Sequence, residues 1–296
     1  MEDFLHNMDW VLPLRSDWAT PVATGFTWLG YTPFFLMFLP VGYWLWDRAM
    51  FTRLAVLIAI TAVVNGWFKD LWQDTRPDPK YWLDGRIEGS PGRPSGHAQV
   101  AVAMWLWLAY EIRKSWAWIA AIIITFGVCF SRLYLGVHDV DDILVGSAFG
   151  LASIGLFILL LGPSFDFWRR LPFWVHLAVI LALVPLLWAV WPPEGPAGSS
   201  FFGHIAVLFL LFGWVAGQAI DYRLAPERGP RPAIWKQIVM AVGGIVVLFA
   251  IRAGIDNGGD ALGLSRAITG YGGAAILGFY ATGLAPMAFR ALKLMR

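Results

Sequence analysis

Residues 92–105 read GRPSGHAQVAVAMW, and this stretch decides the class of fold. It begins with residues that disfavour a helix, places Ser95 beside His97 with one glycine between them, and then continues without a charge as far as Tyr110. A helix that crosses the hydrocarbon of a bilayer needs about 20 mostly apolar residues. The stretch therefore indicates a membrane helix with a serine and a histidine at its N-terminus.

The composition of the whole chain agrees with a membrane protein. Of 296 residues, 58% are hydrophobic and only 14% are charged, which excludes an ordinary soluble globular domain. The net charge of +2 comes without a basic stripe, so we expect no nucleic-acid partner. The single cysteine, Cys129, excludes an intramolecular disulfide and a cysteine-rich metal site. Acidic residues follow Met1, so we expect no signal peptide.

Apolar stretches between charges and Pro/Gly breaks predict an all-α, polytopic bundle of about nine transmembrane helices, preceded by an N-terminal interfacial segment. The predicted spans are 26–46, 52–72, 95–112, 115–135, 139–162, 172–191, 201–221, 234–253 and 266–289.

The distribution of charge predicts the orientation in the membrane. An odd number of spans places the two termini on opposite sides, and the side that holds the 73–94 loop carries most of the acidic residues. The other side carries most of the Lys and Arg residues, and basic loops stay in the cytoplasm. We therefore expect a multi-pass protein of the cell inner or plasma membrane with a cytoplasmic C-terminus and an extracytoplasmic 73–94 loop.

Three polar stretches begin or end predicted spans on that extracytoplasmic side: KDLWQDTRP (69–77), PSGH (94–97) and SRLYLGVHDVDD (131–142). Ionisable residues at this depth are costly unless they are paired or line a wet cavity, so they are candidates for function. The residues that can converge are Lys69, Arg76, Ser95, His97, Arg132, His138 and Asp142.

The residue types in these stretches point to a phosphate ligand. Ser95 is a good helix N-cap, and Gly96 lets a ligand approach the helix N-terminus, where unpaired N–H groups attract anions. The guanidinium groups of Arg76 and Arg132 can each hold two phosphate oxygens, and Lys69 adds a point charge. For Lys69 and Arg76 taken singly, snorkelling to the interface is an alternative interpretation.

The third stretch supplies a nucleophile and its support. A histidine can form a covalent phosphoryl intermediate when one ring nitrogen is unprotonated and the other is held as N–H. His138 and Asp142 are four residues apart and share a helix face, so the carboxylate can orient the ring. Asp141 is the alternative orienter. Asp139 is expected to be an exposed acid that favours the helix dipole.

Together the three stretches resemble the three signature motifs of the type-2 phosphatidic acid phosphatase superfamily. This family includes lipid phosphate phosphatases, isoprenyl-pyrophosphate phosphatases, glucose-6-phosphatase and vanadium haloperoxidases. The resemblance implies that His138 attacks phosphorus, that His97 protonates the leaving oxygen and that Asp142 holds His138. It further implies no metal or other cofactor, and that the phosphoryl oxygens are bound by Lys69, Arg76, Ser95, Gly96 and Arg132.

The resemblance covers only part of the chain. It assigns residues 51–165 to a phosphatase core, which follows an interfacial segment and first span (1–50) and precedes four spans without an assigned role (166–296). We expect hydrolysis of a membrane lipid phosphate or isoprenyl pyrophosphate. A glucose-6-phosphatase-like sugar phosphatase and a lipid phosphotransferase are alternatives, and a transporter is disfavoured because binding alone needs no nucleophile. The oligomeric state is not indicated.

Overall fold

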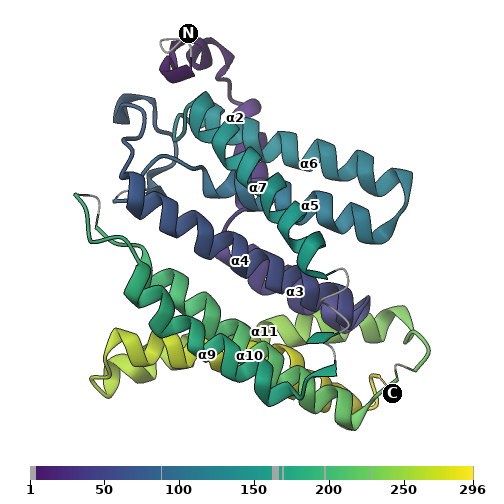
Figure 1. Cartoon of the computed structure of the whole chain (residues 1–296). Coiled ribbons are helices and arrows are strands. Elements are labelled where there is room, and N and C mark those ends of the chain that lie inside the picture. Colours follow the sequence, from purple (N-terminus) through teal and green to yellow (C-terminus); the bar gives the residue numbers. More distant parts are fainter. Residues whose placement is uncertain are drawn as a thin grey trace. The chain divides into compact units, whose positions relative to one another are not determined.

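The computed structural model describes residues 5–87, 89–161, 167–168, 170–196, 198–227 and 229–295, and the helices dominate this part of the chain (Figure 1). Short helical turns occupy Asp9–Leu14 (η1), Pro79–Tyr81 (η2) and Gly85–Ile87 (η3). The longer helices are α2 (Ala19–Trp28), α3 (Thr32–Leu45), α4 (Arg48–Trp72), α5 (Gly96–Ile112), α6 (Ser115–Tyr134), α7 (Val140–Leu161), α9 (Phe173–Val190), α10 (Phe201–Leu224) and α11 (Ile234–Ala261). The last helical stretch comprises η4 (Ile268–Gly272), α12 (Gly273–Phe279), η5 (Tyr280–Leu284) and α13 (Ala285–Ala291).

The predicted all-α membrane bundle is confirmed, and each of the nine predicted spans overlaps a helix. By length and composition, seven of the described helices can cross a membrane, or up to eight if α2 and α3 form one bent span. Helix α5 is not among them because it has only 17 residues. Residue 162, the predicted end of the fifth span, and the predicted boundary between residues 165 and 166 lie outside the described residues.

The first predicted span, 26–46, is wrong as a single continuous helix. Helices α2 and α3 meet at an angle of 59°. Pro33 explains the break: it has no N–H with which to continue the ladder from Leu29, and it is well placed in the first turn of a new helix. The break leaves Leu29, Gly30 and Tyr31 between the two helices.

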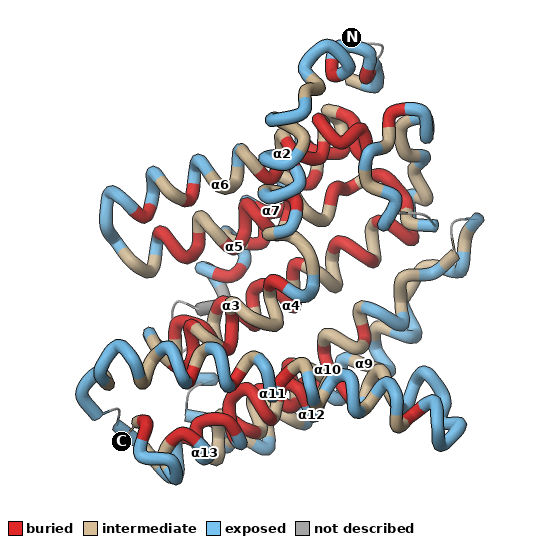
Figure 2. Tube along the Cα trace, turned by 180° about the vertical axis from the view of Figure 1, so that it is seen from behind, coloured by how far each residue is buried: buried red, intermediate tan, exposed pale blue. Residues whose placement is uncertain are grey.

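Contacts divide the chain into two compact units. Unit 1 comprises Met1–Phe35, Leu57–Ser164 and Trp191–Phe201, and unit 2 comprises Leu36–Val56, Phe165–Val190 and Phe202–Arg296. All three polar motifs belong to unit 1. There α5 packs against both α6 and α7 and is largely buried (Figures 1 and 2).

The outward faces of the helices are apolar, as a lipid environment requires. On α6, Ile119, Ile122 and Phe126 are exposed, and on α7 Leu151 and Leu159 are exposed. The buried residues of α6 and α7 lie on the opposite faces of these helices, which are directed into unit 1. The outward faces are thus apolar, unlike those of a soluble protein, while apolar, small and polar residues all pack inside.

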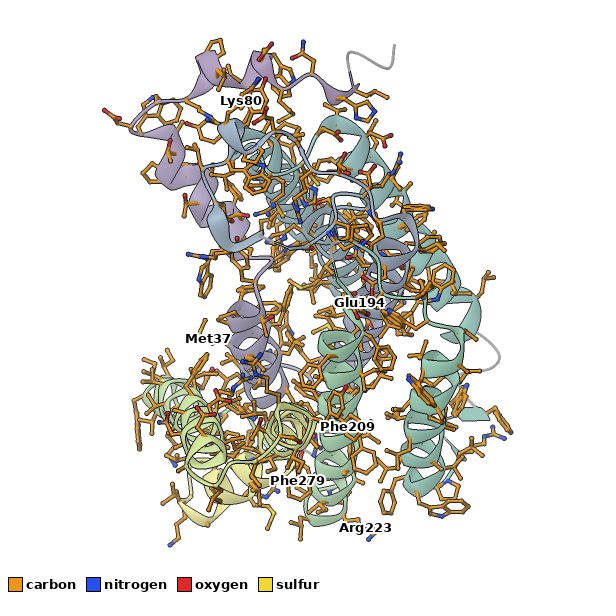
Figure 3. The ribbon with its side chains drawn as sticks, turned by 90° about the vertical axis from the view of Figure 1, so that its left-hand side faces the viewer. Met37, Lys80, Glu194, Phe209, Arg223 and Phe279 are labelled. Atoms are coloured by element: carbon orange, nitrogen blue, oxygen red, sulfur yellow. The ribbon has the colours of Figure 1, made fainter. Side chains whose placement is uncertain are left out.

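Unit 2 is held together by close helix packing. A Cβ atom on Gly213 of α10 would lie 1.9 Å from the carbonyl oxygen of Ala275 in α12, and one on Gly278 would lie 2.0 Å from that of Leu210. Backbones of membrane helices approach this closely only where small residues meet. Aromatic side chains, including the labelled Phe209 and Phe279, extend from the same helices (Figure 3).

Candidate active site

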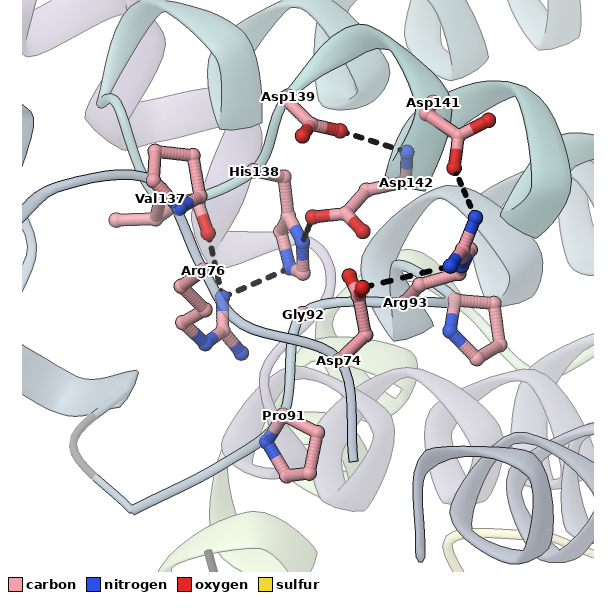
Figure 4. Close-up of polar contacts among 12 residues, drawn as sticks. Asp74, Arg76, Pro91, Gly92, Arg93, Val137, His138, Asp139, Asp141 and Asp142 are labelled. Carbon is pink, nitrogen blue, oxygen red and sulfur yellow. Dashed lines mark hydrogen bonds and ion pairs between the residues drawn. The ribbon is translucent and has the colours of Figure 1, made fainter. Parts of the chain in front are cut away.

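His138 lies in the short turn between α6 and α7 with both ring nitrogens engaged (Figure 4). Its Nδ1 is 2.7 Å from Oδ2 of Asp142, and its Nε2 is 3.1 Å from Nη1 of Arg76. A guanidinium group can only donate, so Nε2 must accept, and the ring proton is on Nδ1, facing the carboxylate. The lone pair of Nε2 is therefore free to act on an electrophile whenever Arg76 turns its donor elsewhere.

Burial and neighbouring cations keep this ring neutral. The side chain of His138 is almost fully buried. Burial lowers the pKa of His138 well below its usual value, and the positive charges of Arg76, Lys69 and Arg132 lower it further. Arg76 is itself affected, because burial and the charge of Arg132 lower its pKa to about 10. Arg76 therefore stays charged at neutral pH.

The neighbouring acids have separate roles. Asp141 accepts from Nη1 of Arg93 at 2.6 Å and does not contact His138, whereas Asp142 does. Asp139, expected to be exposed, is 6% exposed and caps α7: its Oδ1 accepts from the Asp142 N–H at 2.9 Å. Its other oxygen is 2.6 Å from Nδ1 of His6, so the N-terminal segment covers it. The expectation for Asp139 was wrong because this segment is distant in sequence.

The loop that precedes α5 supplies hydrogen-bond acceptors to the cations of the 69–77 stretch. Nζ of Lys69 donates to the carbonyl oxygens of Pro91 and Gly92, the latter at 2.9 Å. Nε of Arg76 donates to the carbonyl oxygen of Ser90 at 2.6 Å. Gly92 lies close to the acid, since a Cβ atom there would be 3.2 Å from Oδ2 of Asp142. The loop thereby brings Lys69 and Arg76 to the His138–Asp142 pair.

Ser95 has the N-cap position of α5, but its side chain makes no capping hydrogen bond. The capping role expected of this side chain is thus not seen. Its backbone N–H donates to the carbonyl oxygen of Asp142 at 3.0 Å, which ties the second motif to the third. Within the described part of the chain, the buried Oγ of Ser95 and the buried Nε2 of His97 have no hydrogen-bond partner. Two polar atoms are therefore open to a ligand.

His97 and Arg132 are connected through residues that the sequence motifs did not include. The ring of His97 packs edge-on against Tyr31, with ring centroids 4.9 Å apart. The Tyr31 hydroxyl donates to Asp84, whose Oδ2 is 3.3 Å from Nη1 of Arg132. Gly30 makes room for the imidazole, since a Cβ atom there would lie 2.2 Å from Cδ2 of His97.

A buried polar network supports the second motif from within unit 1. Nδ2 of Asn65 donates to the Pro94 carbonyl oxygen at 3.1 Å and to Oε1 of Gln99 at 2.8 Å. Gln99 then donates to the carbonyl oxygen of Thr61 at 3.3 Å. One signal in the sequence could have indicated this network, namely the occurrence of amides within otherwise apolar spans. Among the described residues, no group of three His, Cys, Asp or Glu is arranged to hold a metal ion.

Comparison with known proteins points to one family. Residues 50–166 match the PAP2 superfamily. The chain is 32% identical over 126 residues to sphingosine-1-phosphate phosphatase 2 of Mus musculus, in a match that covers 40% of this chain and only 36% of that protein. It is 27% identical over 223 residues to lipid phosphate phosphatase delta of Arabidopsis thaliana, covering 67% and 52%. It is 31% identical over 166 residues to phosphatidylglycerophosphatase B of Bacillus subtilis, covering 52% and 78%.

Proposed function

Because this chain belongs to the PAP2 superfamily, we propose that it is an integral-membrane phosphatase. It hydrolyses a lipid phosphate or isoprenyl pyrophosphate through a phosphohistidine intermediate on the extracytoplasmic face. The observation that carries this proposal is the state of His138, whose Nδ1–H faces Asp142 and whose Nε2 lone pair faces Arg76. Residues 51–165 form the phosphatase core.

In the first step, Nε2 of His138 attacks phosphorus and the bond from phosphorus to the leaving oxygen breaks. His97 gives its proton to that oxygen, and Asp142 stabilises the charge that develops on the imidazole. In the second step, water attacks the phosphorus of phosphohistidine while His97 takes up a proton. Inorganic phosphate leaves, and the Nε2 lone pair returns to His138. No step needs a metal ion.

The phosphoryl oxygens are bound by the cationic side chains and the polar atoms around α5. A phosphoryl transition state spreads negative charge over its equatorial oxygens, so fixed donors stabilise it. The unpartnered Oγ of Ser95 and the N-terminus of α5 at Gly96 are suited to this task. When substrate binds, phosphate oxygens replace some of the protein groups that now accept hydrogen bonds from Lys69, Arg76 and Arg132.

A lipid substrate is favoured by the position of the site at the ends of apolar helices. Lys69 is near the end of α4 and Ser95 precedes α5, so the phosphate lies at the boundary between hydrocarbon and water while the tail stays in the bilayer. The names of the relatives, which include a sphingosine-1-phosphate phosphatase and a phosphatidylglycerophosphatase, support the same class.

The test is release of inorganic phosphate by the purified protein in mixed micelles. The substrates are phosphatidic acid, an isoprenyl pyrophosphate and glucose 6-phosphate, each with EDTA present. We expect turnover of the lipids to depend on their surface mole fraction and to exceed turnover of the sugar phosphate. Equal or better catalytic efficiency on glucose 6-phosphate would overturn the lipid assignment, and activity that requires magnesium would overturn the mechanism.

A further inference from the structure

A basic cavity lies at one end of unit 2, between the segment that leads into α11 and the segment that follows α13. Its volume is about 690 Å³. Four of the described residues that line it are cationic and none is acidic; the cationic residues are Arg231, Lys236, Arg290 and Lys293. A concave surface lined by one sign of charge attracts counter-ions. The cavity belongs wholly to unit 2 and shares no residue with the candidate active site.

Arg290 and Lys236 are held in place, and Arg290 is only partly neutralised. Nη1 of Arg290 donates to Oδ1 of buried Asp221 at 2.7 Å, but the second carboxylate oxygen of Asp221 is 3.1 Å from Nη1 of Arg48. Two guanidinium groups thus share one carboxylate, and Nη2 of Arg290 is buried without a hydrogen-bond partner among the described residues. Nζ of Lys236 donates to the carbonyl oxygen of Lys293 at 2.6 Å, which joins the two walls of the cavity.

The N-terminus of α11 adds to the attraction for an anion. This helix has 28 residues and begins at Ile234, beside the cavity. Ala233 has the N-cap position and offers no capping side chain, so the first N–H groups of the helix are not satisfied by a cap. The positive end of the helix dipole and these N–H groups therefore act in the same direction as the four side chains.

The surroundings of the cavity are suited to a lipid. Ile234, Trp235 and Ile238 in the first turns of α11 are 75%, 59% and 57% exposed. Trp is enriched where a helix meets the membrane interface, and Ile238, one turn further along α11, would contact acyl chains. The charge bias of the loops assigns this end of α11 to the cytoplasmic face, where anionic lipids attract basic residues.

We propose that this cavity is a second, non-catalytic phosphate site that binds the headgroup of an anionic phospholipid. The headgroup phosphate lies among Lys236, Arg290 and Lys293 at the start of α11, and the acyl chains follow the exposed apolar face of that helix. Phosphatidylglycerol is a suitable probe because it is a phosphodiester, which a phosphomonoesterase site does not hydrolyse.

The experiment is native mass spectrometry of the full-length protein in detergent, titrated with phosphatidylglycerol. We expect one tightly retained lipid on the wild type and an affinity at least about tenfold lower in the K236Q/K293Q variant, since each basic residue near the surface strengthens anionic-lipid binding. The matched control is R252Q/R266Q, which removes the same charge from unit 2 outside the cavity and should retain the lipid. Arg290 is left intact because it pairs with Asp221.

Two further arms complete the test. K236R/K293R should restore lipid retention, which separates loss of charge from loss of folding. Glycerol 3-phosphate and inorganic phosphate should compete weakly; displacement of the lipid by either one at equal concentration would assign the site to a soluble phosphate instead. Equal lipid affinity in the wild type and K236Q/K293Q would overturn the proposal, whatever the outcome of the phosphatase assays.

Discussion

At the scale of single residues, the properties of His138 follow from what surrounds its two nitrogens. Asp142 accepts the proton of Nδ1, and Arg76 can only donate to Nε2, so one tautomer is imposed. The same cation that fixes the tautomer also disfavours protonation of the ring. The histidine is consequently neutral and oriented before any substrate arrives.

The pH dependence of activity tests this arrangement. Burial, Arg76 and the other cations lower the pKa of His138 well below its usual value of about 6.5, so the active neutral ring persists at lower pH. The acid limb of kcat/KM should therefore lie below pH ~6.5. Replacing Arg76 by Gln removes one lowering charge and should move the limb toward higher pH. The matched control, Lys114→Gln, changes an exposed cation outside the site and should leave the limb in place. A limb that does not move in Arg76→Gln would contradict the account.

The sequence predicted the pairs that are local and missed those that are not. The spacing of His138 and Asp142 predicted their contact because four residues in a helix make one turn. Nothing local connects Tyr31 or Asp84 with Arg132, because their contacts depend on how α2 and the 73–94 loop return to the site. The roles of the eight candidate residues in catalysis remain predictions, and Arg76→Gln, His97→Ala and His138→Gln test three of them.

At the scale of elements, the breaks between helices form the site as much as the helices do. The break between α2 and α3 brings Tyr31 to His97, and the turn between α6 and α7 presents His138. The hydrophobic pattern predicted a helix in each long apolar run because lipid exposure requires such runs. It did not separate α2 from α3, and it did not predict the short turns η1, η2 and η3. The pattern also missed the 59° bend, since apolar residues occur on both sides of the break.

Asp70 connects the 191–200 segment to the end of α4 through hydrogen bonds. Its Oδ2 accepts from Nε1 of Trp191 at 2.7 Å, from Oγ of Ser199 at 3.0 Å and from the Ser200 N–H at 2.7 Å. Asp70 directly follows Lys69, so these hydrogen bonds also restrict the position of Lys69, a candidate phosphate-binding residue.

Asp70→Asn should destabilise the protein by about 1–3 kcal/mol, because a buried, charge-assisted acceptor of three donors is weakened. The measurement is thermal unfolding in detergent at fixed lipid content. Asp260→Asn alters an exposed carboxylate and serves as the control. An unchanged unfolding temperature in Asp70→Asn would show that the 191–200 segment is held by other contacts.

At the scale of the whole molecule, orientation is the property that links the site to its substrate. The 73–94 loop supplies Arg76 and the carbonyl groups that hold Lys69, so under the proposed function the side on which this loop lies is the side to which phosphate is released. The charge bias of the loops predicts that this side is extracytoplasmic.

The single cysteine makes this orientation easy to test. In a Cys129→Ala background, Lys80→Cys places a thiol in the 73–94 loop, where Lys80 is 64% exposed. Glu227→Cys places one in the exposed connection before α11. A membrane-impermeant maleimide should label Lys80→Cys in intact cells and Glu227→Cys only after permeabilisation. The reverse pattern would place the active site in the cytoplasm.

His138 is expected to carry the phosphoryl group during turnover, and rapid acid-free quenching of a single turnover with a ³²P-labelled lipid phosphate can detect this intermediate. We expect an alkali-stable, acid-labile label on the peptide that contains His138, attached to Nε2 because Nδ1 faces Asp142. The label should be absent in His138→Gln, and His97→Ala should form it at least about 10²-fold more slowly, as expected when a general acid is lost. Rapid phosphate release without any label on His138, or a label on another residue, would contradict the account.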